Sequence, residues 1–130
     1  MNATLTVVNF SHPVTPEQRA AIAQQAGYQE VEVLEPPNQL DLHGDVVEQV
    51  RAMVDAVPLS AEDWQGTPLV VVLPGLALSA AVALAELNGR MGHFPTVVRM
   101  ARGQGPVAAY EVLGLLDLQG VRDDARTRRR

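Results

Sequence analysis

Apolar residues in this chain fall into short runs and longer stripes, two patterns that predict strands and helices. Residues 68–73 form an unbroken apolar run, and residues 5–10 are rich in Val and Thr, as in strands buried inside a parallel sheet. Residues 30–34 alternate polar and apolar side chains, which predicts a half-buried strand. Two more strands are predicted at residues 96–100 and 108–115.

The segment after the first strand carries the clearest helix signal in the chain. Thr15 is a good N-cap, Pro16 suits the first helical turn, and Gln18 completes a capping box. Alanines and an isoleucine continue the helical pattern as far as Gly27, which is expected to end the helix. Local chemistry therefore specifies both ends of this element.

Three more helices are predicted further along the chain. Residues 45–57 place four valines and a methionine on one face. Residues 76–87 are rich in alanine, and this helix is expected to end near Asn88-Gly89. Residues 118–129 predict a last helix with arginines at its C-terminal end, where the helix dipole favours cations.

The order of these elements predicts the fold class. Strands and helices alternate up to the fourth strand, and a fifth strand and a helix follow. This order is typical of an α/β protein with a mostly parallel, Rossmann-like sheet of four to five strands and helices on both faces. The length suits one domain, which we place at residues 1–121, with residues 122–130 as an arginine-rich helix end or tail.

The charge distribution limits the partners of this domain. All ten basic residues are arginine, and five of them lie in the last nine positions. Residues 1–121 hold five arginines against thirteen acidic residues, a net charge of −8. A domain with this net negative charge repels a phosphate backbone, which argues against binding to duplex nucleic acid. An anionic ligand would have to be held by a few groups aimed at it.

Other classes of chemistry find little support. The chain has no cysteine, and His12, His43 and His93 are too scattered for a metal site. No phosphate-binding loop, dinucleotide fingerprint or nucleophile elbow is present, so no cofactor is predicted. The apolar stretches are too short to span a bilayer and the N-terminus lacks a signal-peptide pattern, which predicts a cytoplasmic protein.

Two candidate segments follow predicted strands. Asn9, Ser11 and His12 leave the first strand, and Pro74-Gly75 leaves the third. Because ligands of open α/β sheets sit outside the carboxyl ends of the strands, these residues predict a site for an anion. The alternative is that the polar side chains only satisfy turn backbone and that Pro-Gly is an ordinary tight turn.

A third candidate segment precedes the fourth strand. Arginine grips phosphate through two parallel hydrogen bonds, and phenylalanine or histidine stacks on a base. A helix C-cap with a solvent-facing arginine would explain one glycine here and leave the other side chains unexplained. The residues in question are Arg90, Gly92, His93 and Phe94, followed by Arg99 in the strand.

These stretches together resemble a known family. They are Val8-Asn9-Phe10-Ser11-His12-Pro13 with Thr15-Pro16, Leu73-Pro74-Gly75, and Asn88-Gly89-Arg90-Met91-Gly92-His93-Phe94-Pro95 with Arg99. They resemble the Csx-fifteen family, small accessory proteins of type III CRISPR loci. The resemblance runs from about residue 4 to residue 122 and leaves out the tail after Arg126.

The resemblance implies a fold related to the CRISPR-associated Rossmann-fold sensors and a cyclic tetra-adenylate ligand. Such proteins lower the level of this messenger either as a ring nuclease or as a sponge. A ring nuclease needs no metal, because a ribose 2′-hydroxyl attacks the neighbouring phosphate. The expected ligand-binding residues are Asn9, Phe10, Ser11, His12, Pro74, Gly75, Arg90, Gly92, His93, Phe94 and Arg99.

Turnover finds less support in the sequence than binding does. The chain has no lysine, and His12 and His93 flank different loops, so we predict no catalytic residue and interpret the protein as a sponge. A metal-independent ring nuclease is the alternative, and a protein-interaction module that binds no nucleotide is the third possibility.

The direction of the strands also predicts how copies of the chain assemble. The Ser11-His12 turn and Pro74-Gly75 should lie at the carboxyl edge of the sheet, and residues 90–94 at the opposite edge. One domain can hardly close both edges around one ring, which predicts a ligand-promoted, head-to-tail homo-oligomer with the ring between protomers. A two-fold dimer with one central pocket is the competing arrangement.

Overall fold

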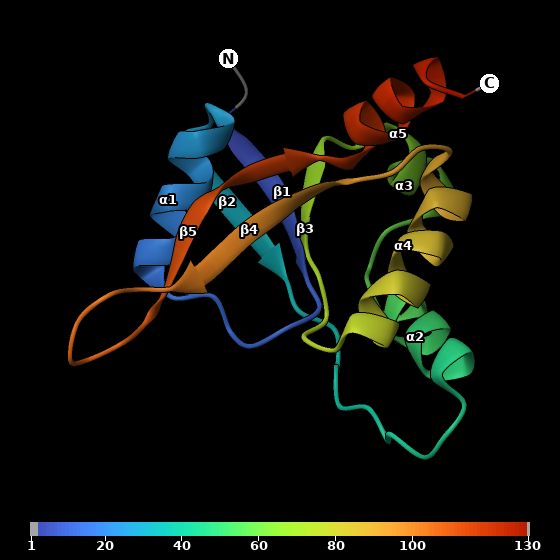
Figure 1. Ribbon diagram of the computed structural model, residues 1–130, viewed down its shortest axis with the longest axis horizontal. Helices are drawn as coiled ribbons and strands as arrows, with labels where there is room; N and C mark the ends of the chain where they lie inside the picture. Colours follow the sequence, from blue (N-terminus) through green and yellow to red (C-terminus); the bar gives the residue numbers. More distant parts are fainter. Residues whose placement is uncertain (1–2, 130) are drawn as a thin grey trace.

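Five strands form one open sheet in the order β2-β1-β3-β4-β5, with the first four parallel and β5 antiparallel to β4 (Figure 1). The computed structural model describes residues 3–129, so Met1, Asn2 and Arg130 of the expected domain and tail lie outside it. The expected α/β, Rossmann-like class is confirmed. The strands are β1 (Thr4–Asn9), β2 (Glu30–Leu34), β3 (Leu69–Val72), β4 (Thr96–Arg102) and β5 (Tyr110–Asp117).

Helices pack on both faces of the sheet. They are α1 (Pro16–Ala26), α2 (Val46–Asp55), α3 (Ala61–Gly66), α4 (Ala77–Met91) and α5 (Leu118–Thr127). Figure 1 shows α1 on one side of the sheet and the other helices on the opposite side. We call these sides the α1 face and the α4 face. Because successive strand residues point to opposite faces, Val70 packs against α1, and Val71 packs against α2 and α4.

The strand order reverses between β1 and β3. The chain runs from β1 outward to β2, then returns to place β3 and β4 on the other side of β1. At such a reversal the connections leave toward opposite faces and open a crevice outside the carboxyl ends of the strands. The backbone N–H of Phe10 donates to the carbonyl of Val72 at 2.9 Å, so the two strands stay paired up to the crevice.

The predicted caps of α1 are confirmed. The Gln18 N–H donates to the Thr15 hydroxyl at 3.1 Å, and the Thr15 N–H donates to Oε1 of Gln18 at 2.9 Å. Gly27 ends the helix in the left-handed region, at φ +78°. Gln18 also donates through Nε2 to the carbonyl of Tyr110 at 2.9 Å, which ties the first turn of α1 to β5.

Two predictions about the helices were wrong. α4 does not end at Asn88-Gly89 but continues to Met91, because Gly89 keeps helical geometry and the turn is made by Gly92 at φ +83°. The short helix α3 was missed. Its six residues are too few to show a helical stripe, although Ser60 and Asp63 form a capping box there.

The strands of the last hairpin differ from their predicted bounds, and β5 begins at Tyr110 instead of Ala108. β4 continues to Arg102 and β5 to Asp117, because each pairs with the other along its length. Within residues 3–129, no helix has the length and apolar character needed to cross a membrane.

The end of α4 can be tested with two glycine variants. Gly92→Ala should lower the free energy of unfolding by about 1–2 kcal/mol, because alanine is strained in the left-handed region. Gly89→Ala should raise it by roughly 0.5–1 kcal/mol, since a methyl group there meets nothing within 4 Å and alanine favours a helix. Urea denaturation measures both. If Gly89→Ala is the more damaging change, the helix ends earlier than described.

Candidate functional site

Asn9 builds the turn at the end of β1. Its side chain is fully buried, and Oδ1 accepts the N–H of Ser11 at 2.9 Å. Its Nδ2 donates to the carbonyl of His12 at 2.8 Å and to Oε1 of Glu35 at 3.3 Å. A buried amide with both its donor and its acceptor satisfied fixes the turn, which leaves the His12 ring exposed at the carboxyl edge.

The Ser11-His12 turn lines three neighbouring cavities. One cavity of about 390 Å³ extends toward Pro74-Gly75, and a second of about 340 Å³ extends toward Glu35. The third, of about 790 Å³, lies on the α1 face. Five residues predicted from the sequence line the first of these cavities together, namely Phe10, Ser11, His12, Pro74 and Gly75.

The first turn of α4 opens onto the same edge. Its N-cap, Leu76, offers no side-chain hydrogen bond to the free N–H groups of that turn, and a methyl group at Gly75 would meet nothing within 4 Å. Ser79, also in this turn, is only 3% exposed. Uncapped N–H groups at a helix N-terminus favour an anion.

Two arginines of β4 lie beside this edge. Val71 pairs in register with Val97, so Arg99 lies level with Leu73, just before Pro74-Gly75. Arg99 shares the α4 face with Val97, two positions earlier. Arg99 and Arg102 are exposed, and neither makes an ion pair or hydrogen bond within the described residues.

Sequence reasoning missed Arg102 because it ended the fourth strand at Met100. No alternation of exposed and covered side chains marks this extension, because Met100 and Ala101 are both partly buried between the exposed Arg99 and Arg102. Because successive strand residues point to opposite faces, Arg102 lies on the same face as Met100, which is the α1 face. The carboxyl end of β4 therefore presents one unpaired guanidinium on each side of the sheet.

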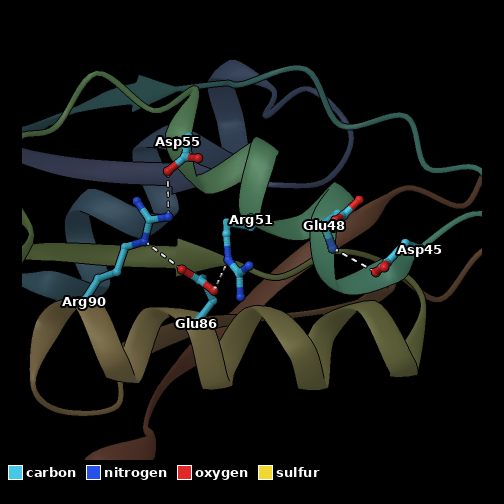
Figure 2. A network of polar contacts seen from close by, with 6 residues as sticks. All are labelled: Asp45, Glu48, Arg51, Asp55, Glu86 and Arg90. Carbon is cyan, nitrogen blue, oxygen red and sulfur yellow. Dashed lines mark hydrogen bonds and ion pairs between the residues drawn. The ribbon is translucent and has the colours of Figure 1, made fainter.

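Arg90 lies elsewhere, in an ion-pair network between α2 and α4 (Figure 2). Its Nη2 lies 2.6 Å from Asp55 and its Nε lies 2.9 Å from Glu86. Glu86 also accepts from Nε of Arg51 at 3.3 Å. Burial alone would lower the pKa of Arg90, but the two carboxylates outweigh it and raise that pKa above its ordinary value. Packing of α2 against α4 thus accounts for this arginine.

His93 and Phe94 lie at the opposite, amino edge, as the strand direction requires. They line a cavity of about 390 Å³ together with Met91, Thr96 and Gln119. The Phe94 N–H donates to Oε1 of Gln119 at 2.8 Å, which anchors the turn to α5. Gly92 caps α4 and leads into this turn.

The structure therefore divides the predicted site residues into three groups. Phe10, Ser11, His12, Pro74 and Gly75 meet at the carboxyl edge, with Asn9 behind them and Arg99 beside them. The segment from Gly92 to Phe94 lies at the amino edge, and Arg90 lies between two helices. Among residues 3–129, no three His, Asp or Glu side chains converge as a metal site requires.

Comparisons with models of known families, with curated proteins and with solved structures found no match to this chain. A fold class supports many unrelated functions, so the chemistry of these two edges is the basis for assigning one.

The role of Asn9 in the turn can be tested by substitution. Asn9→Ala should lower the free energy of unfolding by about 2–3 kcal/mol, because it leaves the Ser11 N–H unpaired and a cavity in a buried position. Asn38→Ala, at an exposed amide that contacts the same turn, is the matched control and should cost less than about 1 kcal/mol. Equal losses in chemical denaturation would contradict the role given to Asn9.

Proposed function

We propose that this protein binds cyclic tetra-adenylate at the carboxyl edge of its sheet and holds it without cleaving it, as a sponge. The observation that carries the proposal is the cavity lined by Phe10, His12 and Gly75 at the uncapped N-terminus of α4, with the unpaired Arg99 on the neighbouring strand β4. The resemblance of these segments to the Csx-fifteen family supports this ligand, membership of that family, and a place in the cytoplasm with the messenger.

The charges of the site suit a compact polyanion. In an acidic domain, unpaired guanidinium groups are the places where phosphate is attracted, and helix N–H groups add a second, local attraction. Duplex nucleic acid needs a broad basic surface, which this domain lacks, so a small cyclic ligand fits the charge distribution better.

The amino edge supports a head-to-tail assembly. The His93 ring is exposed and Phe94 partly exposed beside a hollow, so they offer stacking surfaces for bases held on the carboxyl edge of a neighbour. Contact between two different surfaces is heterologous and propagates as a filament if it does not close. In this arrangement Arg90 holds α4 against α2 through its ion pairs. The N-terminal end of α4 lies at the carboxyl edge of the sheet and its C-terminal end at the amino edge.

His12 supports a second candidate, the metal-independent ring nuclease. Its ring is exposed in the proposed site and would lie beside the ligand, where an imidazole can take the proton of a ribose 2′-hydroxyl.

The phosphate contact predicts the effect of one substitution. Arg99→Ala should weaken binding of cyclic tetra-adenylate by about 1–3 kcal/mol, or roughly 5- to 150-fold, because a charge-assisted contact is lost. Isothermal calorimetry measures the affinity. The control is Arg122→Ala, on the exposed face of α5, which should bind like the parent protein. Equal affinities for all three proteins would place the phosphates elsewhere.

A second experiment separates sponge from nuclease and tests the assembly. Labelled cyclic tetra-adenylate is incubated with excess protein, the complex is sized by chromatography with light scattering, and the extracted label is analysed. The sponge predicts an intact ring and particles that grow with added ligand. A linear product that is lost in His12→Ala would establish the nuclease instead. An intact ring on a particle of unchanged size would contradict head-to-tail assembly.

A further inference from the structure

The cavity of about 790 Å³ on the α1 face results from the way the sheet ends. The last strand, β5, is antiparallel, and the helix after it packs through Leu118 on the α4 face. Among the described helices only α1 packs on the α1 face, so the carboxyl ends of β3 and β4 lack a second cover there. The bond from Gln18 to Tyr110 bridges α1 and β5 and bounds the space that remains.

The lining of this cavity is apolar at its base. Val72, Val98 and Met100 come from the sheet, and Ala21 comes from α1. The volume lies within the range of roughly 300–1,000 Å³ that is usual for small-molecule sites. A polarisable methionine among small apolar side chains suits a planar ring, since a thioether makes favourable contacts with aromatic systems.

The rim of the cavity carries negative charge. Glu17 lines it from α1, and its carboxylate has no hydrogen-bond partner within residues 3–129. Glu111 also borders the cavity, but its carboxylate lies against Gly103, and Val112 beside it points to the α1 face in its place. The Glu17 carboxylate repels phosphate, so the part of a nucleotide that enters must be uncharged. A carboxylate accepts hydrogen bonds and donates none, so it prefers a ring with an amino group to one with a carbonyl at that position.

Phosphate has a partner just outside this rim. Arg102 pairs in register with Tyr110, which lines the cavity, and lies on the α1 face. A nucleotide with its ring inside and its phosphate near Arg102 would match the charge at both ends. The Ser11-His12 turn lines both this cavity and the one beside Pro74-Gly75, so the two hollows adjoin.

We infer that the cavity between α1 and the β4-β5 hairpin is a nucleobase pocket that selects a base with an exocyclic amino group. This inference rests on the proposed function, under which the base is one adenine of the cyclic ligand. The apolar base of the cavity packs on the ring, Glu17 accepts from the amino group, and the phosphates stay at the arginine-bearing edge.

A pair of neighbouring substitutions on α1 tests the pocket. Ala21→Leu fills the cavity and should weaken cyclic tetra-adenylate binding by roughly tenfold or more, because the ring loses its space. Its melting temperature should stay at or above that of the parent, which excludes loss of the fold. Ala20→Leu, at the exposed position next to it, should bind normally. Unchanged affinity in Ala21→Leu would overturn the pocket while leaving the proposed function in place.

Ring chemistry supplies the second test. A cyclic tetranucleotide with hypoxanthine in place of adenine presents a carbonyl instead of the amino group, and should bind roughly tenfold more weakly. The difference should shrink in Glu17→Gln, because an amide both donates and accepts. Equal binding of the two rings by the parent protein would overturn the selection of an amino group.

Free adenosine separates this inference from the proposed function. It should shift the NMR methyl resonance of Met100. The methyl resonance of Met53, which is buried on the α4 face, should stay unchanged. If adenosine shifts Met100 but cyclic tetra-adenylate does not bind, the pocket stands and the proposed function fails. If cyclic tetra-adenylate binds and adenosine leaves Met100 unchanged, the pocket is wrong.

Discussion

The reversal of strand order between β1 and β3 is the constraint on which the site depends. Because β2 and β3 lie on opposite sides of β1, the chain leaves β1 toward one face and leaves β3 toward the other. The two departing segments cannot cover the gap between them, and the hydrogen bond from Phe10 to Val72 keeps its two sides at a fixed spacing. Asn9 then holds the turn through its hydrogen bonds with Ser11 and His12, and its Nδ2 also donates to Glu35. The carboxyl edge is therefore preformed, and a ligand would bind there without ordering a loop first.

The distribution of arginines decides where an anion can bind on this acidic domain. Arg19 donates to the carbonyl of Val31, and Arg51 and Arg90 are held by carboxylates between α2 and α4. That leaves Arg99 and Arg102 as the guanidinium groups of residues 3–121 without a partner in the described chain, and both lie toward the carboxyl end of β4. Phosphate recognition thus converges on the edge that the strand order opens.

The fold class and several boundaries could be predicted from the sequence because they depend on local signals. The capping box at Thr15 and the glycine at position 27 mark α1 whatever the rest of the chain does. The end of α4 could not be predicted in the same way. Gly89 and Gly92 are equally plausible caps by composition, and only the path of the chain into β4 decides between them. The six residues from Ala61 to Gly66 show the same limit, because α3 is too short to be recognised by periodicity.

The sequence predicted which turn residues meet at the carboxyl edge, but not which arginines are free to bind an anion there. The strand-end rule placed Ser11, His12 and Gly75 together, because it depends on topology alone. Whether an arginine is available depends on partners distant in sequence. Asp55 lies thirty-five positions before Arg90, so the pairing leaves no trace in the local pattern. The cavity on the α1 face could not be predicted either, because it arises from a helix that packs on the other side of the sheet.

The most direct test of the central claim is a titration of the isotopically labelled protein with cyclic tetra-adenylate, followed through its backbone amide NMR resonances. The account predicts that the largest shifts occur at Ser11, His12 and Gly75 and in the first turn of α4, while the α2–α4 network around Glu86 changes little. Shifts confined to α5 and its arginines, or no shifts at saturating ligand, would contradict it.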